Sequence, residues 1–111
     1  MATSSFFRVI DFTSTTADYD LLATDTGVRT AIKARFGGIT DEQLDAKLVD
    51  GIPDMNFQVF VQGVTTIKIN GEEYDFLEDE VFSTGDYVRG KIKTIQITQN
   101  SISGQFRFNI L

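Results

Sequence analysis

The stretch that decides the fold runs from residue 55 to residue 77 and reads MNFQVFVQGVTTIKINGEEYDFL. Two runs within it alternate apolar and polar residues, with apolar side chains at Met55, Phe57, Val59, Val61, Ile67 and Ile69. A period of two is the pattern of a β-strand with one buried face. Asn70-Gly71 then precedes a third run at 73–77, and this dipeptide strongly favours a two-residue hairpin turn. The stretch therefore predicts consecutive antiparallel strands.

Strand patterns also flank this stretch on both sides. Residues 6–12 are aromatic and β-branched, 87–98 read as one long strand bent at Gly90, and 105–111 alternate again. The inward positions of these runs predict the core of the sheet. We expect it to contain Phe57, Val59, Ile67, Ile69, Phe76, Ile95, Ile97, Phe106 and Phe108.

Two short helices are predicted before residue 55. Apolar residues recur at helical spacing over 26–36, and Gly37-Gly38 can end that helix. Thr40 and Gln43 have the spacing of a capping box for a second helix, which Gly51 and Pro53 would end. The expected fold is α+β: a mainly antiparallel β-sandwich or partly closed barrel with a two-helix insertion near 26–50. At 111 residues, the chain 1–111 is one domain.

The composition excludes most catalytic and metal chemistry. The chain has no Cys and no His, so thiolate nucleophiles, disulfides, zinc-thiolate sites and the commonest general base near neutral pH are absent. Residues 85–92 match a phosphate-binding loop only up to the last position, where Ile92 replaces the Ser or Thr that holds magnesium. We expect no enzyme activity, no catalytic residue, no cofactor and no metal.

Charge is spread unevenly along the chain. The net charge is -6 overall, but residues 37–86 carry -10 and residues 87–111 carry +4. The interface candidates are the acidic loop Glu78, Asp79 and Glu80 and the basic side chains Arg89, Lys91, Lys93 and Arg107. They either pair within one sheet or meet between copies of the chain in a head-to-tail contact. So few basic groups in an acidic chain argue against a nucleic-acid partner.

The N-terminal segment is a second candidate for contacts outside the domain. Phe6 and Phe7 are adjacent, so they cannot both face the same side of a strand. We expect a strand and arm over 1–18 to contact neighbouring molecules, and we count both rings as interface candidates. No stretch approaches the roughly 20 apolar residues that span a bilayer, so we expect no membrane partner.

The short N-terminal strand, the Ser/Thr-rich segment 11–19 and the β-rich half ending in Phe108-Asn109-Ile110-Leu111 together resemble small structural proteins of tailed-bacteriophage particles. The resemblance implies self-association or attachment to other structural proteins of a particle. It implies capsid decoration, head-tail joining or a tail or baseplate role, with location in the virion after assembly in the host cytoplasm. The expected function is that of a non-enzymatic assembly protein. The alternative is a binding module that recognises sugar or peptide through its loops.

Overall fold

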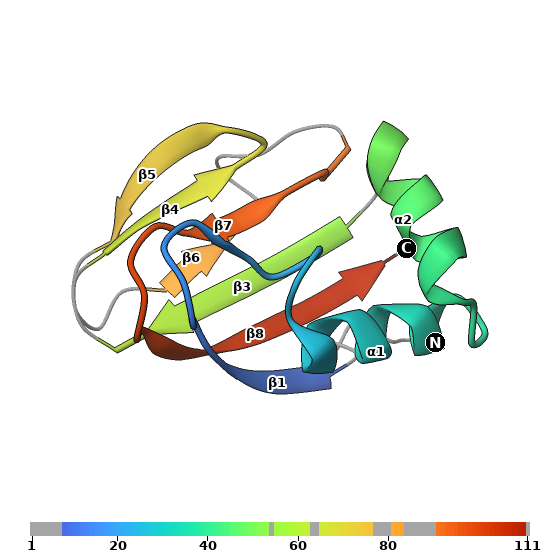
Figure 1. The fold of residues 1–111 in the computed structure, drawn as a ribbon, viewed down its shortest axis with the longest axis horizontal. Helices are drawn as coiled ribbons and strands as arrows, with labels where there is room; N and C mark the ends of the chain where they lie inside the picture. Colours follow the sequence, from blue (N-terminus) through green and yellow to red (C-terminus); the bar gives the residue numbers. More distant parts are fainter. Residues whose placement is uncertain (1–7, 54, 63–64, 77–80, 84–90, 111) are drawn as a thin grey trace.

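The computed structural model describes residues 8–53, 55–62, 65–76, 81–83 and 91–110. Two four-stranded sheets and two helices make up this part of the chain (Figure 1). The first sheet has the order β1 (Arg8–Thr13), β8 (Ser103–Ile110), β3 (Met55–Val61) and β6 (Val81–Ser83), and the second has the order β2 (Tyr19–Asp20), β7 (Ile95–Ile97), β4 (Thr65–Ile69) and β5 (Glu72–Phe76). Every pairing between the described strands is antiparallel. The α+β fold with antiparallel sheets is confirmed, and the two sheets remain separate rather than closing into a barrel.

The two helices lie at one end of the sheets (Figure 1). In α1 (Thr26–Arg35), Asp25 caps the N-terminus by accepting a hydrogen bond from the Val28 N–H. The predicted capping box of α2 (Asp41–Asp50) is present, because Thr40 and Gln43 each accept a hydrogen bond from the other's backbone N–H. Such a cap satisfies backbone donors that a helix start otherwise leaves free. The two-helix insertion is therefore confirmed at 26–50.

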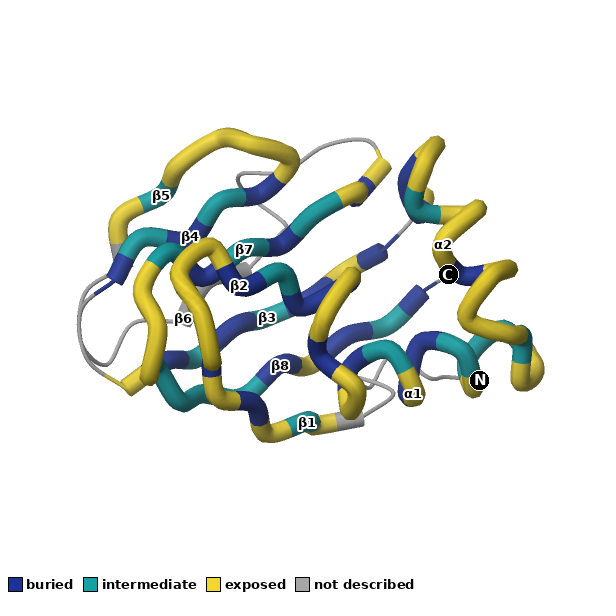
Figure 2. Tube along the Cα trace, in the orientation of Figure 1, coloured by how far each residue is buried: buried dark blue, intermediate teal, exposed yellow. Residues whose placement is uncertain are grey.

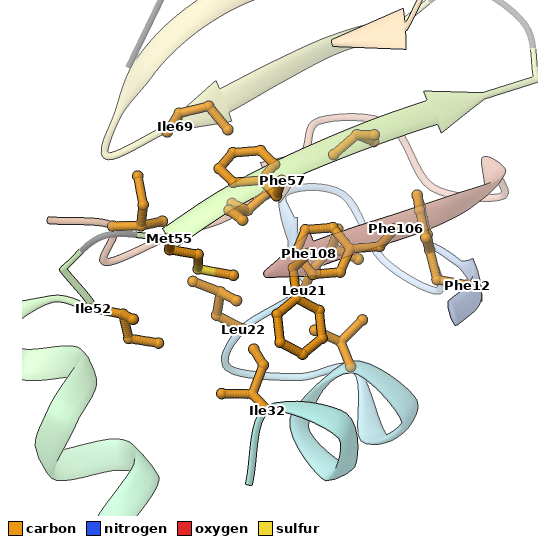
Figure 3. Packing of buried hydrophobic residues seen from close by; sticks show 14 of the residues in the cluster. Phe12, Leu21, Leu22, Ile32, Ile52, Met55, Phe57, Ile69, Phe106 and Phe108 are labelled. Atoms are coloured by element: carbon orange, nitrogen blue, oxygen red, sulfur yellow. The ribbon is translucent and has the colours of Figure 1, made fainter. Parts of the chain in front are cut away.

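One hydrophobic core joins both sheets and α1 (Figure 3). At its centre, the Phe106 ring lies 5.7 Å from the Phe57 ring and 5.8 Å from the Phe108 ring, centroid to centroid. The second sheet contributes isoleucines from β4 and β7, and α1 contributes Val28 and Ile32. Buried positions alternate with less buried ones along β3 and β4 and over residues 106–110 of β8, as Figure 2 shows. The predicted core is confirmed except for Phe76, whose side chain lies outside the described part of the structure.

The Asn70-Gly71 turn also has the predicted geometry. Asn70 and Gly71 are the only two residues between β4 and β5, and their φ angles are 52° and 86°. Positive φ at both central positions is characteristic of a type I′ turn, whose twist matches that of the flanking strands. This turn fixes the register of the β4–β5 hairpin, with Ile69 opposite Glu72.

The prediction of one long strand over 87–98 is wrong for its described part. Only Ile95–Ile97 forms a strand, and Ile92 makes an isolated bridge with Ile52. The side chain of Asn70 explains the interruption, because its Oδ1 accepts hydrogen bonds from the backbone N–H groups of Lys93 and Thr94. These donors are therefore used by a side chain rather than by a neighbouring strand. The expected bend at Gly90 lies outside the described residues.

The N-terminal strand belongs to the sheet of its own domain. β1 pairs with β8 along its whole length, from Arg8 opposite Phe108 to Thr13 opposite Ser103. The next residue, Ser14, is buried, and its hydroxyl donates to the Gln99 carbonyl and accepts from the Ile102 N–H. Residues 8–14 therefore do not extend away from the domain as an arm. The predicted contact of segment 1–18 with neighbouring molecules stays a prediction.

Candidate interaction surface

The outward side of β1, β8 and β3 is a strand surface of exposed and half-buried side chains. Because successive side chains of a strand point to opposite faces, burial of Phe106 and Phe108 directs Gln105 and Arg107 outward. Arg107 lies opposite Gln58 on one side and Val9 on the other. We call this surface the outer face and define it by Val9, Asp11, Thr13, Gln58, Phe60, Ser103, Gln105 and Arg107.

Two adjoining hollows lie on the outer face. One has a volume of about 170 Å³ and is lined by Gln58, Phe60, Gln105 and Arg107. The second, of about 360 Å³, shares Phe60 and Gln105 with the first and continues toward β1 and residue 62. Together they form one shallow depression across three strands. Its lining combines amide and hydroxyl groups with the Phe60 ring, the Arg107 guanidinium group and the Asp11 carboxylate.

Arg107 is the predicted interface residue whose position is clearest. Its side chain is exposed, and its guanidinium group donates a long hydrogen bond of 3.5 Å to Gln105 Oε1. Across the described ranges, no carboxylate lies within ion-pair distance of it. The exposed acids Glu72, Glu73 and Asp75 are on β5, at the edge of the other sheet. Pairing of Arg107 with an acidic strand within one sheet, one of the two sequence-based alternatives, is therefore not observed in the described residues.

Lys91 and Lys93 lie elsewhere, beside the end of α2. Lys91 Nζ is 2.5 Å from a carboxylate oxygen of Asp50, and this hydrogen bond lowers the pKa of Asp50 below its usual value. A Cβ atom on Gly51 would approach within 2.7 Å of Lys91 Cβ and 3.1 Å of Lys93 Cγ, so both lysine stems pack against this glycine. Lys91 and Lys93 therefore do not lie on the long strand predicted over 87–98. Lys91 pairs with a helix end, a partner that strand patterns do not reveal.

Six of the interface candidates lie outside the described residues: Phe6, Phe7, Glu78, Asp79, Glu80 and Arg89. Three of the nine candidates, Lys91, Lys93 and Arg107, are described, and the structure separates Arg107 from the lysine pair.

A charged cleft between the two helices went unrecognised in the sequence. Arg29 of α1 lies 3.0 Å from Asp41 and 2.9 Å from Asp45, and Lys33 lies 2.9 Å from Asp41. Hydrogen bonds from Lys33 and Arg29 lower the pKa of Asp41. The signal in the sequence is the pair of basic residues four positions apart on one helix and the pair of acidic residues four apart on the next. Each of these charges has an opposite partner, so the ion pairs across this cleft of about 300 Å³ hold the two helices together.

Tyr19 and Asp25 form a buried hydrogen-bonded pair at the start of α1. The Tyr19 hydroxyl donates a 2.7 Å hydrogen bond to Asp25 Oδ1, while Asp25 Oδ2 accepts from the Val28 N–H at 3.0 Å. Burial, together with the hydrogen bond to Asp25, raises the pKa of Tyr19 to about 12. Both oxygens of the carboxylate therefore have donors, and the pair anchors the helix start rather than presenting a reactive group.

The described residues hold no group of three or more metal-binding side chains placed to share an ion. Neither described helix has the length and apolar character needed to cross a membrane. Comparisons with protein-family models, with curated proteins and with solved structures found no match.

Proposed function

We propose that the protein is a non-enzymatic structural assembly protein that acts through contacts between its copies and with other structural proteins of a particle. The observation that supports this most is the outer face. It presents Arg107 without an acidic partner among the described residues, next to the half-buried Phe60. An aromatic ring and an arginine side by side are the residue types enriched where proteins bind one another.

The distribution of charge over the two sheets supports contact between copies. Arg107 lies in the middle of one sheet, whereas the exposed acids of β5 lie at the edge of the other. Arg107 of one copy would meet the acidic β5 edge of the next. Such a contact uses two different surfaces and therefore repeats head to tail, which suits a component of a larger particle.

The proposed particle is the virion of a tailed phage, with assembly in the host cytoplasm. This part rests on the resemblance of the N-terminal segment and the β-rich C-terminal half to small structural proteins of such particles. A chain with no Cys and no His, and with no group of three or more metal-binding side chains among its described residues, is compatible with that role.

Sedimentation velocity at low and high salt tests the head-to-tail contact. We expect wild type to form larger species with rising concentration at low salt but not at high salt, because exposed charges are screened beyond about 8 Å at physiological ionic strength. We expect Arg107→Glu to remove these species at low salt, because it reverses the charge that would meet the acidic β5 edge. Lys47→Glu is the control, since it makes the same change of charge at an exposed position on α2, where the ammonium group contacts the Phe36 ring and not the outer face. Identical distributions for wild type and Arg107→Glu at low salt would overturn the proposed contact.

The second candidate is a module that binds sugar or peptide. The depression around Phe60 favours it, because an aromatic ring flanked by the amides of Gln58 and Gln105 can contact a ligand with its face while the amides bond to polar groups. The ligand would then occupy a sheet face rather than the loops expected from the sequence. Calorimetric titration with neutral oligosaccharides separates the two functions: saturable binding that Phe60→Ala removes, in a protein that remains monomeric, supports the module.

A further inference from the structure

The hairpin turn at Asn70-Gly71 contains a chemically labile peptide link. The backbone nitrogen of Gly71 can attack the side-chain carbonyl carbon Cγ of Asn70, forming an N–Cγ bond and releasing Nδ2 as ammonia, which carries off the proton of the Gly71 N–H. Water then opens the cyclic imide at either carbonyl and leaves aspartate or isoaspartate. Glycine favours the attack because it has no side chain to hinder its nitrogen, and both residues of this turn are exposed to water.

The fold holds the side chain of Asn70 away from this reaction. Its Nδ2 donates a 2.8 Å hydrogen bond to the Lys91 carbonyl, and its Oδ1 accepts from the N–H groups of Lys93 at 2.7 Å and Thr94 at 3.2 Å. The Asn70 N–H also donates to the Thr94 carbonyl at 3.1 Å. Attack by Gly71 requires Cγ to turn toward its own backbone, which breaks the three side-chain hydrogen bonds.

We propose that Asn70 is a latent modification site, in which binding of its side chain to residues 91–94 suppresses deamidation and release of that side chain permits it. The inference does not depend on the proposed function. It rests on the sequence Asn70-Gly71, the exposure of both residues and the set of hydrogen bonds that occupies every polar atom of the Asn70 amide.

Neither product of the modification can keep the hydrogen bonds that the Asn70 side chain makes in the folded protein. A carboxylate at position 70 has no hydrogen to donate to the Lys91 carbonyl and instead faces it with a second acceptor. Isoaspartate also lengthens the backbone by one methylene group within a turn of only two residues. Both products therefore weaken the link between the β4–β5 hairpin and the segment that carries Lys91 and Lys93.

The test compares deamidation of the folded and unfolded full-length chain. Both samples are kept in the same mildly alkaline buffer, one of them with guanidinium chloride, and conversion at Asn70 is followed by peptide mapping with mass spectrometry. We expect conversion in the folded protein to be at least about tenfold slower, because several hydrogen bonds must break first. A difference smaller than that would overturn the proposal.

Two variants separate the side-chain hydrogen bonds from the general protection that any fold provides. Ile92→Ala loosens the segment that binds Asn70, since it removes the buried side chain that anchors this segment in the core. Val59→Ala removes a comparable buried group from β3 of the first sheet, whereas Asn70 follows β4 of the second sheet. Asn100, which precedes Ser101 in an exposed turn, serves as the internal reference. We expect Ile92→Ala to raise conversion at Asn70 relative to Asn100 and Val59→Ala to leave that ratio unchanged. An unchanged ratio in Ile92→Ala would overturn the proposal, and the folded-to-unfolded comparison in wild type stands if that variant does not fold.

Discussion

Tyr19 and Asp25 show how two polar side chains become part of a hydrophobic core. Both are buried, and each oxygen of the carboxylate has its own donor, from the Tyr19 hydroxyl and the Val28 N–H. A buried polar atom without a partner costs more than a typical hydrogen bond contributes. The pair therefore offsets the cost of burying the polar groups at the start of α1. Its contribution to the free energy of unfolding is measured by removing one of its members.

The first prediction concerns Tyr19→Phe, which leaves Asp25 Oδ1 without its donor. We expect the free energy of unfolding at neutral pH to fall by about 1–3 kcal/mol. The folded-state pKa of Tyr19 is about 12 against an ordinary value of 10, so its contribution to stability is complete below pH 10 and is lost as pH rises to 12. Denaturant titrations across this range should show wild type losing its advantage over the variant. If the free energies of unfolding of wild type and Tyr19→Phe differed by a constant amount up to pH 12, the raised pKa of Tyr19 would be contradicted.

At the scale of elements, local chemistry could be predicted from the sequence and long-range contacts could not. The Thr40–Gln43 capping box and the Asn70-Gly71 turn depend on residues within a few positions of one another, and both were predicted. Alternation likewise placed Arg107 on the outward side of its strand. These features follow from rules about neighbours in the chain.

The errors arise where a side chain bonds to backbone far away in the sequence. Asn70 takes the N–H groups of Lys93 and Thr94 and so shortens the strand expected there, although these residues are more than twenty positions apart. The two-residue strand β2 exists only through its pairing with β7, and Lys91 finds its partner Asp50 at a helix end. No periodicity within either segment records such a contact.

The second prediction concerns the aromatic centre of the first sheet. Phe108 is fully buried, lies opposite Phe57 and stacks on Phe106. Phe108→Ala should lower the free energy of unfolding by about 3–5 kcal/mol, a large share of the roughly 5–15 kcal/mol typical of a domain. Arg107→Ala, one position away on the outer face, should change it by no more than about 0.5 kcal/mol. Melting of Phe108→Ala within a degree or two of wild type would show that the face assignment is wrong.

At the scale of the whole molecule, β1 is both part of the fold and an edge of it. Within the described strands it ends its sheet, and its residue Val9 is 55% exposed. Its inner side contributes the buried Phe12, and Gly27 at the start of α1 lies against Ile10. The strand thus covers part of the core with its inner side, and one of its hydrogen-bonding edges has no partner among the described strands.

The third prediction follows from this double role. Deleting residues 1–12 removes all but one residue of β1, so we expect the truncated chain to lose cooperative unfolding in denaturant titrations. Deleting only residues 1–7 keeps β1 (Arg8–Thr13) and removes Phe6 and Phe7, so we expect folding to survive while self-association in sedimentation experiments weakens. If the chain that lacks residues 1–12 unfolded cooperatively at the same denaturant concentration as the full chain, the structural role of β1 would be contradicted.

The position of β8 between β1 and β3 also has a consequence for biosynthesis. Thr13 meets Ser103 across 90 positions of the chain, so β1 leaves the ribosome long before its partner is made. At the usual rates of translation, of about 5–20 residues per second, the delay is roughly 5–20 s. The β4–β5 hairpin can close before that interval ends, whereas Phe12 has to wait for β8. The nascent chain therefore carries β1 without its partner until β8 has been synthesised, and the sheet that bears the outer face is completed only then.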